Sequence, residues 1–341
     1  MSHFPLRVGL IGAGGITHAH LPAWQELGAT VTVFALAGAE TLAEHYPIRI
    51  VGSAQELFEH SDIVDICTPT PTHREYAEAA LLAGKDVICE KPIALTRADA
   101  DAIGDLARRL GRRVYPAQVV RFFPEYALAK QAVDSGSIGR MAVSRFTRIG
   151  EYPHWAPWFS DEALSGGIVM DQMIHDIDIA RWISGEVSRV YAVRSASRAG
   201  DRVSAQVTLT HKNGALSYVT GVWGAPGTTF TTGFSLAGTL GVLTHDTSAD
   251  SSVALNAGTT APQSGMRPDT SLVESPYLTE LREFAAACTG GPEPRVLLED
   301  GARAVELAEA ANLSIRLKRP VSVAPGKPAS IVPGNSGKEE E

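Results

Sequence analysis

A chain of 341 residues exceeds the roughly 100–200 residues of an ordinary domain and suggests two domains. Its 30 basic and 38 acidic side chains give a net charge of −8, which argues against binding to nucleic acid or an anionic membrane. Hydrophobic residues at 44% and charged residues at 20% are typical of a folded globular protein. The cysteines show no metal-ligand spacing, and neither a membrane span nor a signal peptide is evident. We therefore expect a cytoplasmic protein with no metal site.

The first 120 residues alternate short β-branched runs with helical stretches. Strand-like runs occupy residues 6–11, 30–35, 48–51, 63–68, 86–90 and 113–118. This alternation predicts an α/β domain with a doubly wound parallel sheet, the Rossmann arrangement that binds dinucleotides.

After Arg121 the pattern changes. Helical patterns at 125–134 and 170–183 are followed by successive strand-like runs at 189–195, 204–211, 215–222, 228–236 and 241–244. Strands without intervening helices predict an α+β domain with a large open, mostly antiparallel sheet. Two more helices are expected at 276–287 and 298–317, where the chain can return to pack on the first domain. We predict a dinucleotide-binding domain at 1–120, a substrate-binding and oligomerisation domain at 121–323, and a disordered, proline-containing tail at 324–341.

A glycine-rich loop follows the first predicted strand. Gly12, Gly14, Gly15 and Ile16 stand where a strand turns into a helix, so the loop can approach a pyrophosphate held at the helix N-terminus. A tight turn without any ligand is the alternative. Thr17 replaces the usual third glycine. The second strand ends without the acidic residue that would bind a ribose hydroxyl and without an arginine for a 2′-phosphate, which leaves NAD and NADP both open.

The fifth predicted strand ends in Glu90-Lys91-Pro92. Ligands of open α/β sheets bind beyond the carboxyl ends of the strands, so this position favours contact with a ligand. A lysine there can hydrogen-bond a substrate hydroxyl and stabilise the oxyanion that forms as the proton leaves. A solvated surface lysine beside a turn proline is the alternative.

The predicted helix at 170–183 carries Asp171, His175 and Asp178 at positions i, i+4 and i+7 among apolar residues. An imidazole titrates near neutrality and can remove a hydroxyl proton, and a carboxylate one turn away can orient it. The alternatives are a core histidine with satisfied hydrogen bonds, a surface stripe of ion pairs, and metal binding by these side chains.

Taken in order, these motifs resemble those of the glucose–fructose oxidoreductase/inositol dehydrogenase/MocA (Gfo/Idh/MocA) family, from Val8 to about Val323. The motifs that carry the resemblance are the Gly12-x-Gly14 loop, Thr68-Pro-Thr-Pro-Thr-His73, Glu90-Lys91-Pro92, Arg121-Phe122, Gly166-Gly167, and Asp171-x-x-x-His175 followed by Asp178.

The resemblance implies an enzyme, an NAD- or NADP-dependent oxidoreductase, in which His175 is the acid/base, Lys91 contacts substrate and nicotinamide, and Asp171 supports them. It also implies oligomers built through the open sheet. The residues expected to line the cofactor are those of the glycine loop together with Thr68, Pro69, His73, Glu90, Lys91 and Pro92, and those expected to contact the substrate are Arg121 and His154.

We therefore expect hydride transfer between a nicotinamide cofactor and a secondary alcohol of a sugar or an inositol-like cyclic polyol. An NAD-dependent glycosidase of the same fold and a non-catalytic nucleotide-sensing protein are the alternatives. A homodimer or homotetramer is expected, because one sheet face offers more β-branched and aromatic surface than a helix covers. The residues assigned to that face are Thr208, Thr210, Tyr218, Thr220, Trp223, Phe230 and Phe234.

Overall fold

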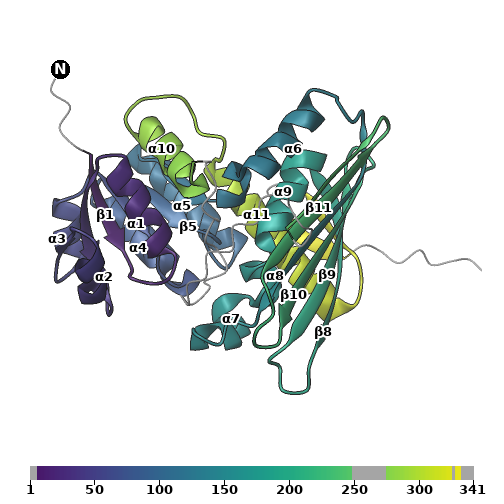
Figure 1. Ribbon diagram of the computed structural model, residues 1–341, viewed down its shortest axis with the longest axis horizontal. Coiled ribbons are helices and arrows are strands. Elements are labelled where there is room, and N and C mark those ends of the chain that lie inside the picture. The colour runs from purple at the N-terminus through teal and green to yellow at the C-terminus, as the bar shows by residue number, and fades with distance from the viewer. Residues whose placement is uncertain (1–5, 248–273, 325–326, 332–341) are drawn as a thin grey trace, which may run out of the picture. The chain divides into compact units, whose positions relative to one another are not determined.

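The computed structural model describes residues 6–247, 274–324 and 327–331, which separate into two compact units (Figure 1). The first unit holds residues 6–129, 157–167 and 274–305, and the second holds the rest. None of the helices in the described ranges is long and apolar enough to cross a membrane.

The first unit is built on a six-stranded sheet whose paired strands all run parallel, in the order β3-β2-β1-β4-β5-β6. This order defines the doubly wound dinucleotide-binding fold and confirms the prediction. The strands are β1 (Arg7–Ile11), β2 (Thr30–Phe34), β3 (Arg49–Ile50), β4 (Ile63–Ile66), β5 (Asp86–Glu90) and β6 (Val114–Ala117).

The first unit also contains helices and short 3₁₀ turns. They are α1 (Thr17–Glu26), α2 (Ala39–His45), α3 (Ala54–Glu59), η1 (Thr70–Thr72), α4 (His73–Leu82), α5 (Arg97–Leu110), η2 (Val119–Phe122), η3 (Pro157–Ser160), α7 (Glu162–Ser165) and α10 (Pro276–Cys288). Two further helices, α6 (Pro124–Asp134) and α11 (Leu298–Leu317), contribute residues to both units.

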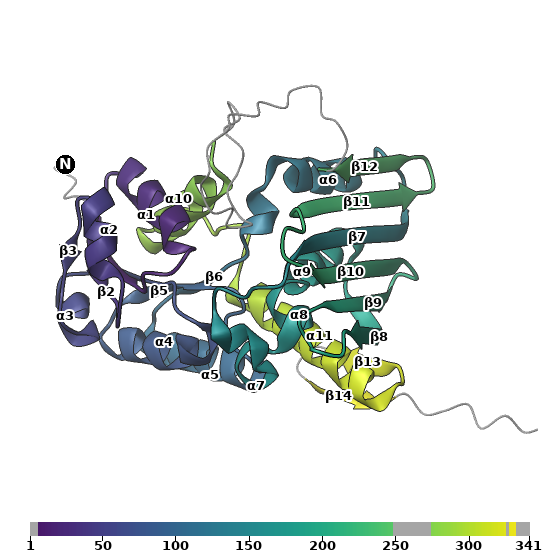
Figure 2. The same cartoon turned by 60° about the horizontal axis from the view of Figure 1, so that its bottom comes forward.

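Helix α10 completes the core of the first unit although it comes late in the chain. It packs beside α1 in both views (Figures 1 and 2). Its apolar residues Leu278, Leu281 and Phe284 are buried in one cluster with Val8 and Trp24. The expected return of a late helix to the first domain is thus seen for α10, and residues 274–305 lie in the first unit although they fall within the predicted 121–323 range.

The second unit contains an eight-stranded sheet in the order β12-β11-β7-β10-β9-β8-β13-β14, most of which can be followed in Figure 2. Strands β7 and β10 are parallel and the other paired strands are antiparallel, so the prediction of a mostly antiparallel sheet is confirmed. The strands are β7 (Met141–Glu151), β8 (Val187–Ala196), β9 (Val203–His211), β10 (Leu216–Gly224), β11 (Thr231–Gly238), β12 (Val242–Asp246), β13 (Val321–Ala324) and β14 (Lys327–Ile331).

Three strands of this sheet, β7, β13 and β14, were not predicted from the sequence. Strand β7 was not predicted, because the buried Arg148 interrupts its alternation of inward apolar and outward polar residues. Residues 327–331 pair with β13 as an edge strand, although disorder was expected from residue 324. The remaining tail residues, 325–326 and 332–341, lie outside the described residues.

Helix α9 (Ile174–Ser184) packs on β7 and β10 and covers one face of this sheet. The inner row of side chains contains Phe146, Val219 and Phe234, all buried. Trp223 is buried as well, so it and Phe234 do not belong to the outer face to which the sequence assigned them. Trp223 lies three positions from Thr220 on β10, and residues an odd number of positions apart on one strand face opposite sides of a sheet. Phe234 is in register with the buried Phe146 of β7 and so belongs to the inner row.

Candidate functional site

The glycine loop connects β1 to α1 at the carboxyl edge of the first sheet. Gly12 has φ +116°, and a Cβ there would lie 2.4 Å from the main-chain oxygen of Cys67. Its N–H donates to the carbonyl of Phe34 at 2.9 Å. Only glycine fits this position, because it alone tolerates both the left-handed conformation and the close approach of another strand.

The rest of the loop leaves room for a ligand. A Cβ built on Gly14 or Gly15 would meet nothing within 4 Å among the described atoms. The first turn of α1 carries no acidic side chain, so its N-terminal N–H groups offer a positive end to an anion. Thr17 is fully buried, and its hydroxyl donates to the carbonyl of Gly12 at 3.3 Å, which links the two ends of the loop. The loop therefore fits a dinucleotide pyrophosphate.

The loop after β2 carries no carboxylate between Ala35 and Gly38. Leu36 is 89% exposed there, and Glu40 lies beyond it in the first turn of α2. Gly38 comes close to the glycine loop, since a Cβ on it would lie 3.4 Å from the Cβ of Ala13. The loop at residues 35–38 therefore has no acidic side chain that would favour a ribose hydroxyl over a 2′-phosphate.

His73 joins the loops that follow β4 and β5. Its Nδ1 lies 2.8 Å from the carbonyl oxygen of Pro92, and its Nε2 lies 2.8 Å from that of Thr68. Burial lowers the pKa of His73. The ring is thus held between main-chain groups and orders the segment that includes Pro69, whereas the sequence suggested direct contact with the cofactor.

Glu90 is directed inward and Lys91 is partly exposed. One carboxylate oxygen of Glu90, Oε2, accepts the main-chain N–H of Lys91 at 3.0 Å. The other, Oε1, lies 2.9 Å from Nε2 of His20 in α1. Glu90 therefore supports the loop from within, while Lys91 remains the residue of this motif with access to a ligand.

Sequence reasoning missed His20 and its second partner, Asp65. The Nδ1 of His20 lies 2.9 Å from Oδ2 of Asp65, which also accepts the indole N–H of Trp24 at 2.7 Å. A charged residue in the middle of the buried strand β4, flanked by Val64 and Ile66, was the available signal, because a buried carboxylate needs partners.

The helix predicted at 170–183 is two helices in the structure. Helix α8 (Gly167–Asp171) ends before α9 begins at Ile174. Asp171 and His175 therefore belong to two successive helices and do not lie on one uninterrupted helix. The prediction of one continuous helix at 170–183 was therefore wrong.

Contacts with the sheet explain the break. The side-chain amide of Gln172 donates to the carbonyl of Arg148 in β7 at 2.7 Å. The N–H of Met173 donates to the carbonyl of Ile168 at 2.9 Å, one residue farther back than in a regular α-helix. A Cβ on Gly221 of β10 would lie 2.4 Å from Cγ of Met173, so glycine lets Met173 sit against the strand.

His175 lies in the first turn of α9 and is 5% exposed. The next residue, Asp176, is fully buried and accepts two hydrogen bonds of 2.9 Å from the guanidinium of Arg148. This bidentate pair, which the sequence did not reveal, fixes the start of α9 on the sheet. Asp178 is buried on the same helix, and Asp171 is partly exposed at the end of α8.

The two expected substrate contacts differ in exposure. Arg121 is 1% exposed, pairs with Asp300 at 3.2 Å and donates to the carbonyl of Arg295 at 3.1 Å. These contacts hold η2 to a later segment of the first unit. The burial of Arg121 therefore favours a structural role over the expected contact with substrate. His154 is exposed after β7, with its ring centroid 4.8 Å from that of Tyr152.

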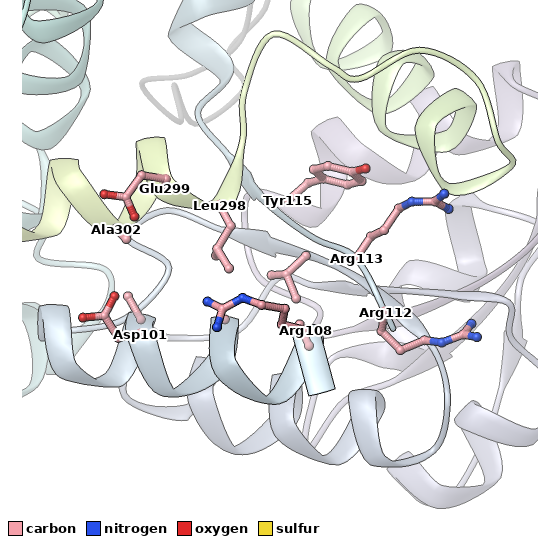
Figure 3. Close-up of a pocket in the computed structure, with 12 residues that line it drawn as sticks. Asp101, Arg108, Arg112, Arg113, Tyr115, Leu298, Glu299 and Ala302 are labelled. Carbon is pink, nitrogen blue, oxygen red and sulfur yellow. The ribbon is translucent and has the colours of Figure 1, made fainter. Parts of the chain in front are cut away.

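A hollow of about 340 Å³ in the first unit lies away from these residues. Figure 3 shows Arg108, Arg112, Arg113 and Tyr115 around it, with Leu298 of α11 opposite. These residues surround the start of β6, so the hollow lies at the amino edge of the parallel sheet. The glycine loop and Lys91 follow strand ends at the carboxyl edge.

Comparison with known proteins agrees with the fold and the motifs. Residues 6–118 match an oxidoreductase family with an NAD-binding Rossmann fold, and residues 126–244 match the GFO/IDH/MocA C-terminal domain. The chain belongs to the GFO/IDH/MocA family of oxidoreductases, and its first unit is an NAD-binding Rossmann domain.

Individual relatives match over most of the chain. Myo-inositol 2-dehydrogenase of Thermotoga maritima is 32% identical over 77% of this chain and 80% of its own length. Inositol 2-dehydrogenase of Rhizobium meliloti is 31% identical over 94% of this chain and 99% of its own length. A solved probable dehydrogenase from Thermotoga maritima matches with a TM-score of 0.80 at 30% identity, over 93% of this chain and 98% of that one. The structure of a levoglucosan dehydrogenase bound to NADH and levoglucosan matches with a TM-score of 0.79 at 25% identity, over 94% of this chain and 100% of that one.

Proposed function

We propose that this protein reversibly oxidises a secondary alcohol of a sugar or an inositol-like cyclic polyol with NAD or NADP. The observation that carries the proposal is the likeness to two inositol dehydrogenases over most of the chain, combined with a glycine loop that has room for a pyrophosphate. Residues Gly12 to Ile16 would hold the dinucleotide, which accepts the hydride when it is bound.

The roles assigned to the side chains follow their chemistry. His175 takes the hydroxyl proton onto a ring nitrogen, and a general base of this kind contributes roughly 10²–10⁴ in rate. The ammonium group of Lys91 donates a hydrogen bond to the substrate oxygen and stabilises the negative charge that develops there. Asp171 supports the geometry and the field around them. His154 is the exposed candidate for substrate contact.

The surroundings of His175 support its role. The Asp176–Arg148 pair anchors α9 beside it, and Gln172 fixes the preceding turn on the sheet. An imidazole on such a rigid element keeps one direction, and precise placement is what proton transfer to a bound hydroxyl requires.

The test is a screen of polyols and sugars for formation of reduced nicotinamide, with NAD and with NADP. With the best substrate, His175→Ala is expected to lower turnover roughly 10²–10⁴-fold while dinucleotide affinity stays nearly unchanged. Lys91→Ala should cost roughly 10²–10³-fold, as loss of an oxyanion donor does. Turnover of His175→Ala close to wild type would contradict the assignment. Hydrolysis of a chromogenic glycoside without net reduction would favour a glycosidase instead.

A further inference from the structure

A buried polar network lies directly behind the Glu90-Lys91-Pro92 motif. It consists of His20 from α1, Asp65 from β4 and Glu90 from β5. His20 and Asp65 have no exposed surface, and Glu90 is 6% exposed. The reaction proposed above does not use these groups, yet buried charges are costly unless they compensate one another.

The hydrogen bonds of His20 to two carboxylates favour a ring that carries a second proton. Both ring nitrogens lie 2.9 Å from carboxylate oxygens, Nδ1 from Asp65 and Nε2 from Glu90. A neutral imidazole carries a single N–H, so one nitrogen would face an anionic oxygen with its lone pair. A doubly protonated ring donates to both and carries the charge that two carboxylates compensate.

His211 in the second unit shows what a neutral ring needs. Its Nδ1 donates to the carbonyl of Gly185 at 2.6 Å, and its Nε2 lies 2.6 Å from the hydroxyl of Ser217, which can donate to it. One ring proton satisfies both contacts, and burial lowers the pKa of His211. The difference from His20 lies in the partners, since both rings are buried.

The remaining neighbours of His20 are neutral. Burial raises the pKa of the Cys67 thiol, 3.6 Å from Nδ1, to about 12, and raises that of Cys89 well above its usual value. From α10, the Tyr277 ring lies 5.8 Å away by centroids, and burial raises the pKa of Glu280 well above 4.5, which favours its neutral form. Burial opposes a charge on His20 itself, but the charge of the Asp65 carboxylate and the hydrogen-bond contacts with Asp65 and Cys67 outweigh it, so the pKa of His20 is raised well above 6.5.

A metal ion would be another way to join these groups. Ligand atoms of His20, Asp65 and Cys67 all lie within 4.8 Å of one another, which a divalent ion could span. The contacts found are hydrogen bonds instead. Asp65 Oδ2 already receives the Trp24 N–H as well as the His20 contact, and the other ring nitrogen of His20 faces Glu90.

We propose that His20 is a positioning residue whose imidazolium bridges Asp65 and Glu90 and thereby fixes Lys91. The link is direct, because the other oxygen of Glu90 accepts the main-chain N–H of Lys91. The effect on turnover rests on the proposed function, whereas the protonation state of the network does not.

A pH dependence follows from this proton. Because the folded-state pKa of His20 is raised, its contribution to the free energy of unfolding is full below 6.5 and disappears as pH rises through the folded-state value. Turnover should fall over the same alkaline range, since Glu90 loses one of its two restraints. This limb is separate from the rise expected when the imidazole of His175 becomes able to accept a proton.

The direct test is nuclear magnetic resonance of ¹⁵N-histidine-labelled full-length protein at about pH 8, above the ordinary imidazole pKa. Two protonated ring nitrogens are expected for one histidine, and the signal should be absent from His20→Gln. His211 should give the pattern of a neutral ring in the same sample. A neutral His20 ring overturns the proposal, and so does stoichiometric zinc in metal analysis of the purified protein.

The kinetic test compares His20→Gln with His45→Gln, an exposed histidine of α2 in the same unit. His20→Gln should lower kcat roughly 10²-fold, the cost of misplacing a catalytic group by about 1 Å, and should lose the alkaline limb. The KM for dinucleotide should stay within about threefold, because the glycine loop is intact. If this variant does not fold, Glu90→Gln replaces it and should show the same split.

If His20→Gln keeps a kcat near wild type and its turnover still falls at alkaline pH as in wild type, the positioning role is overturned. If wild-type protein turns over no polyol or sugar, the proposed function fails, and the resonance experiment still decides whether His20 is an imidazolium.

Discussion

His20, His73 and His211 are almost equally inaccessible, with 0%, 1% and 2% exposure. Burial lowers the pKa of His73 and of His211, whereas that of His20 is raised. Two carbonyl oxygens face His73, and a carbonyl and a hydroxyl face His211; none of these carries a full charge. Only the carboxylates around His20 offset the cost of burying a cation, so partner chemistry decides the charge of a buried ring.

Glu280 differs from His20, because its buried carboxyl has no hydrogen-bond partner among the described residues that would stabilise a charge. Its folded-state pKa is raised well above 4.5, so the free energy of unfolding decreases as pH rises above 4.5, where the unfolded chain releases this proton. Glu280→Gln should therefore be more stable than wild type at about pH 8, with the gain shrinking towards about pH 5. Urea unfolding at both pH values measures this, with the exposed Glu26→Gln as control. A gain independent of pH would mean that Glu280 is not the titrating group.

The two aspartates that flank the helix break should behave differently. Asp176 is buried in a bidentate pair with Arg148, and losing one partner of a buried pair costs about 3–5 kcal/mol. Asp171 is partly exposed, and Asp171→Asn should change stability little while lowering turnover. Denaturant unfolding of both variants separates the roles. Equal stability losses would refute the distinction.

At the scale of elements, the glycine loop separates a folding requirement from a binding requirement. Gly12→Ala forces a left-handed conformation and a Cβ 2.4 Å from the oxygen of Cys67, so it should destabilise the apo-protein by at least about 1–3 kcal/mol. Gly14→Ala meets no protein atom within 4 Å and should leave apo stability near wild type while weakening binding of both dinucleotides. Thermal unfolding and dinucleotide titration check the pair. Unchanged affinity in Gly14→Ala would show that the pyrophosphate does not approach this position.

The loop after β2 predicts the cofactor preference. With no carboxylate between Ala35 and Gly38, NADP should bind at least as well as NAD. Ala35→Asp should lower NADP affinity roughly tenfold or more through like-charge repulsion, while NAD affinity is kept or improved. Fluorescence titration with both cofactors measures the ratio. A strong wild-type preference for NAD would mean that another group, such as Glu40, selects the ribose.

Local pattern was sufficient for the elements of the first sheet, because buried parallel strands appear as short apolar runs between turn signals. The glycine loop and Lys91 were visible for the same reason, since each follows a predicted strand. The break at Gln172 was not visible, because it depends on a carbonyl of β7 and on the absence of a side chain at Gly221. His20 was missed because its partners come from separate strands that only the tertiary fold brings together.

At the scale of the whole molecule, the outer face of the second sheet remains the predicted oligomer interface. Tyr218 lies between Arg145 and Thr208 in register, and Val193 is 45% exposed on the same sheet. Light scattering at micromolar concentration should give a homodimer or homotetramer, and Tyr218→Glu should shift it towards monomer by burying a charge at the contact. Lys212→Glu, in an exposed turn, is the matched control. A monomeric wild type would refute this assignment.

The late position of α10 also affects how the chain is made. Translation delivers residues 6–129 first, but Phe284, which stacks on Tyr115 with ring centroids 5.1 Å apart, is synthesised only after β7 to β12. Domains that fold on the ribosome do so once their own residues have emerged. Until α10 is synthesised, the nascent Rossmann segment therefore leaves exposed the apolar surface around Trp24 that α10 later packs against. Chaperones and proteases can bind this surface in the meantime. A gene fragment ending near residue 129 should accordingly yield an aggregation-prone product rather than a free-standing nucleotide-binding domain.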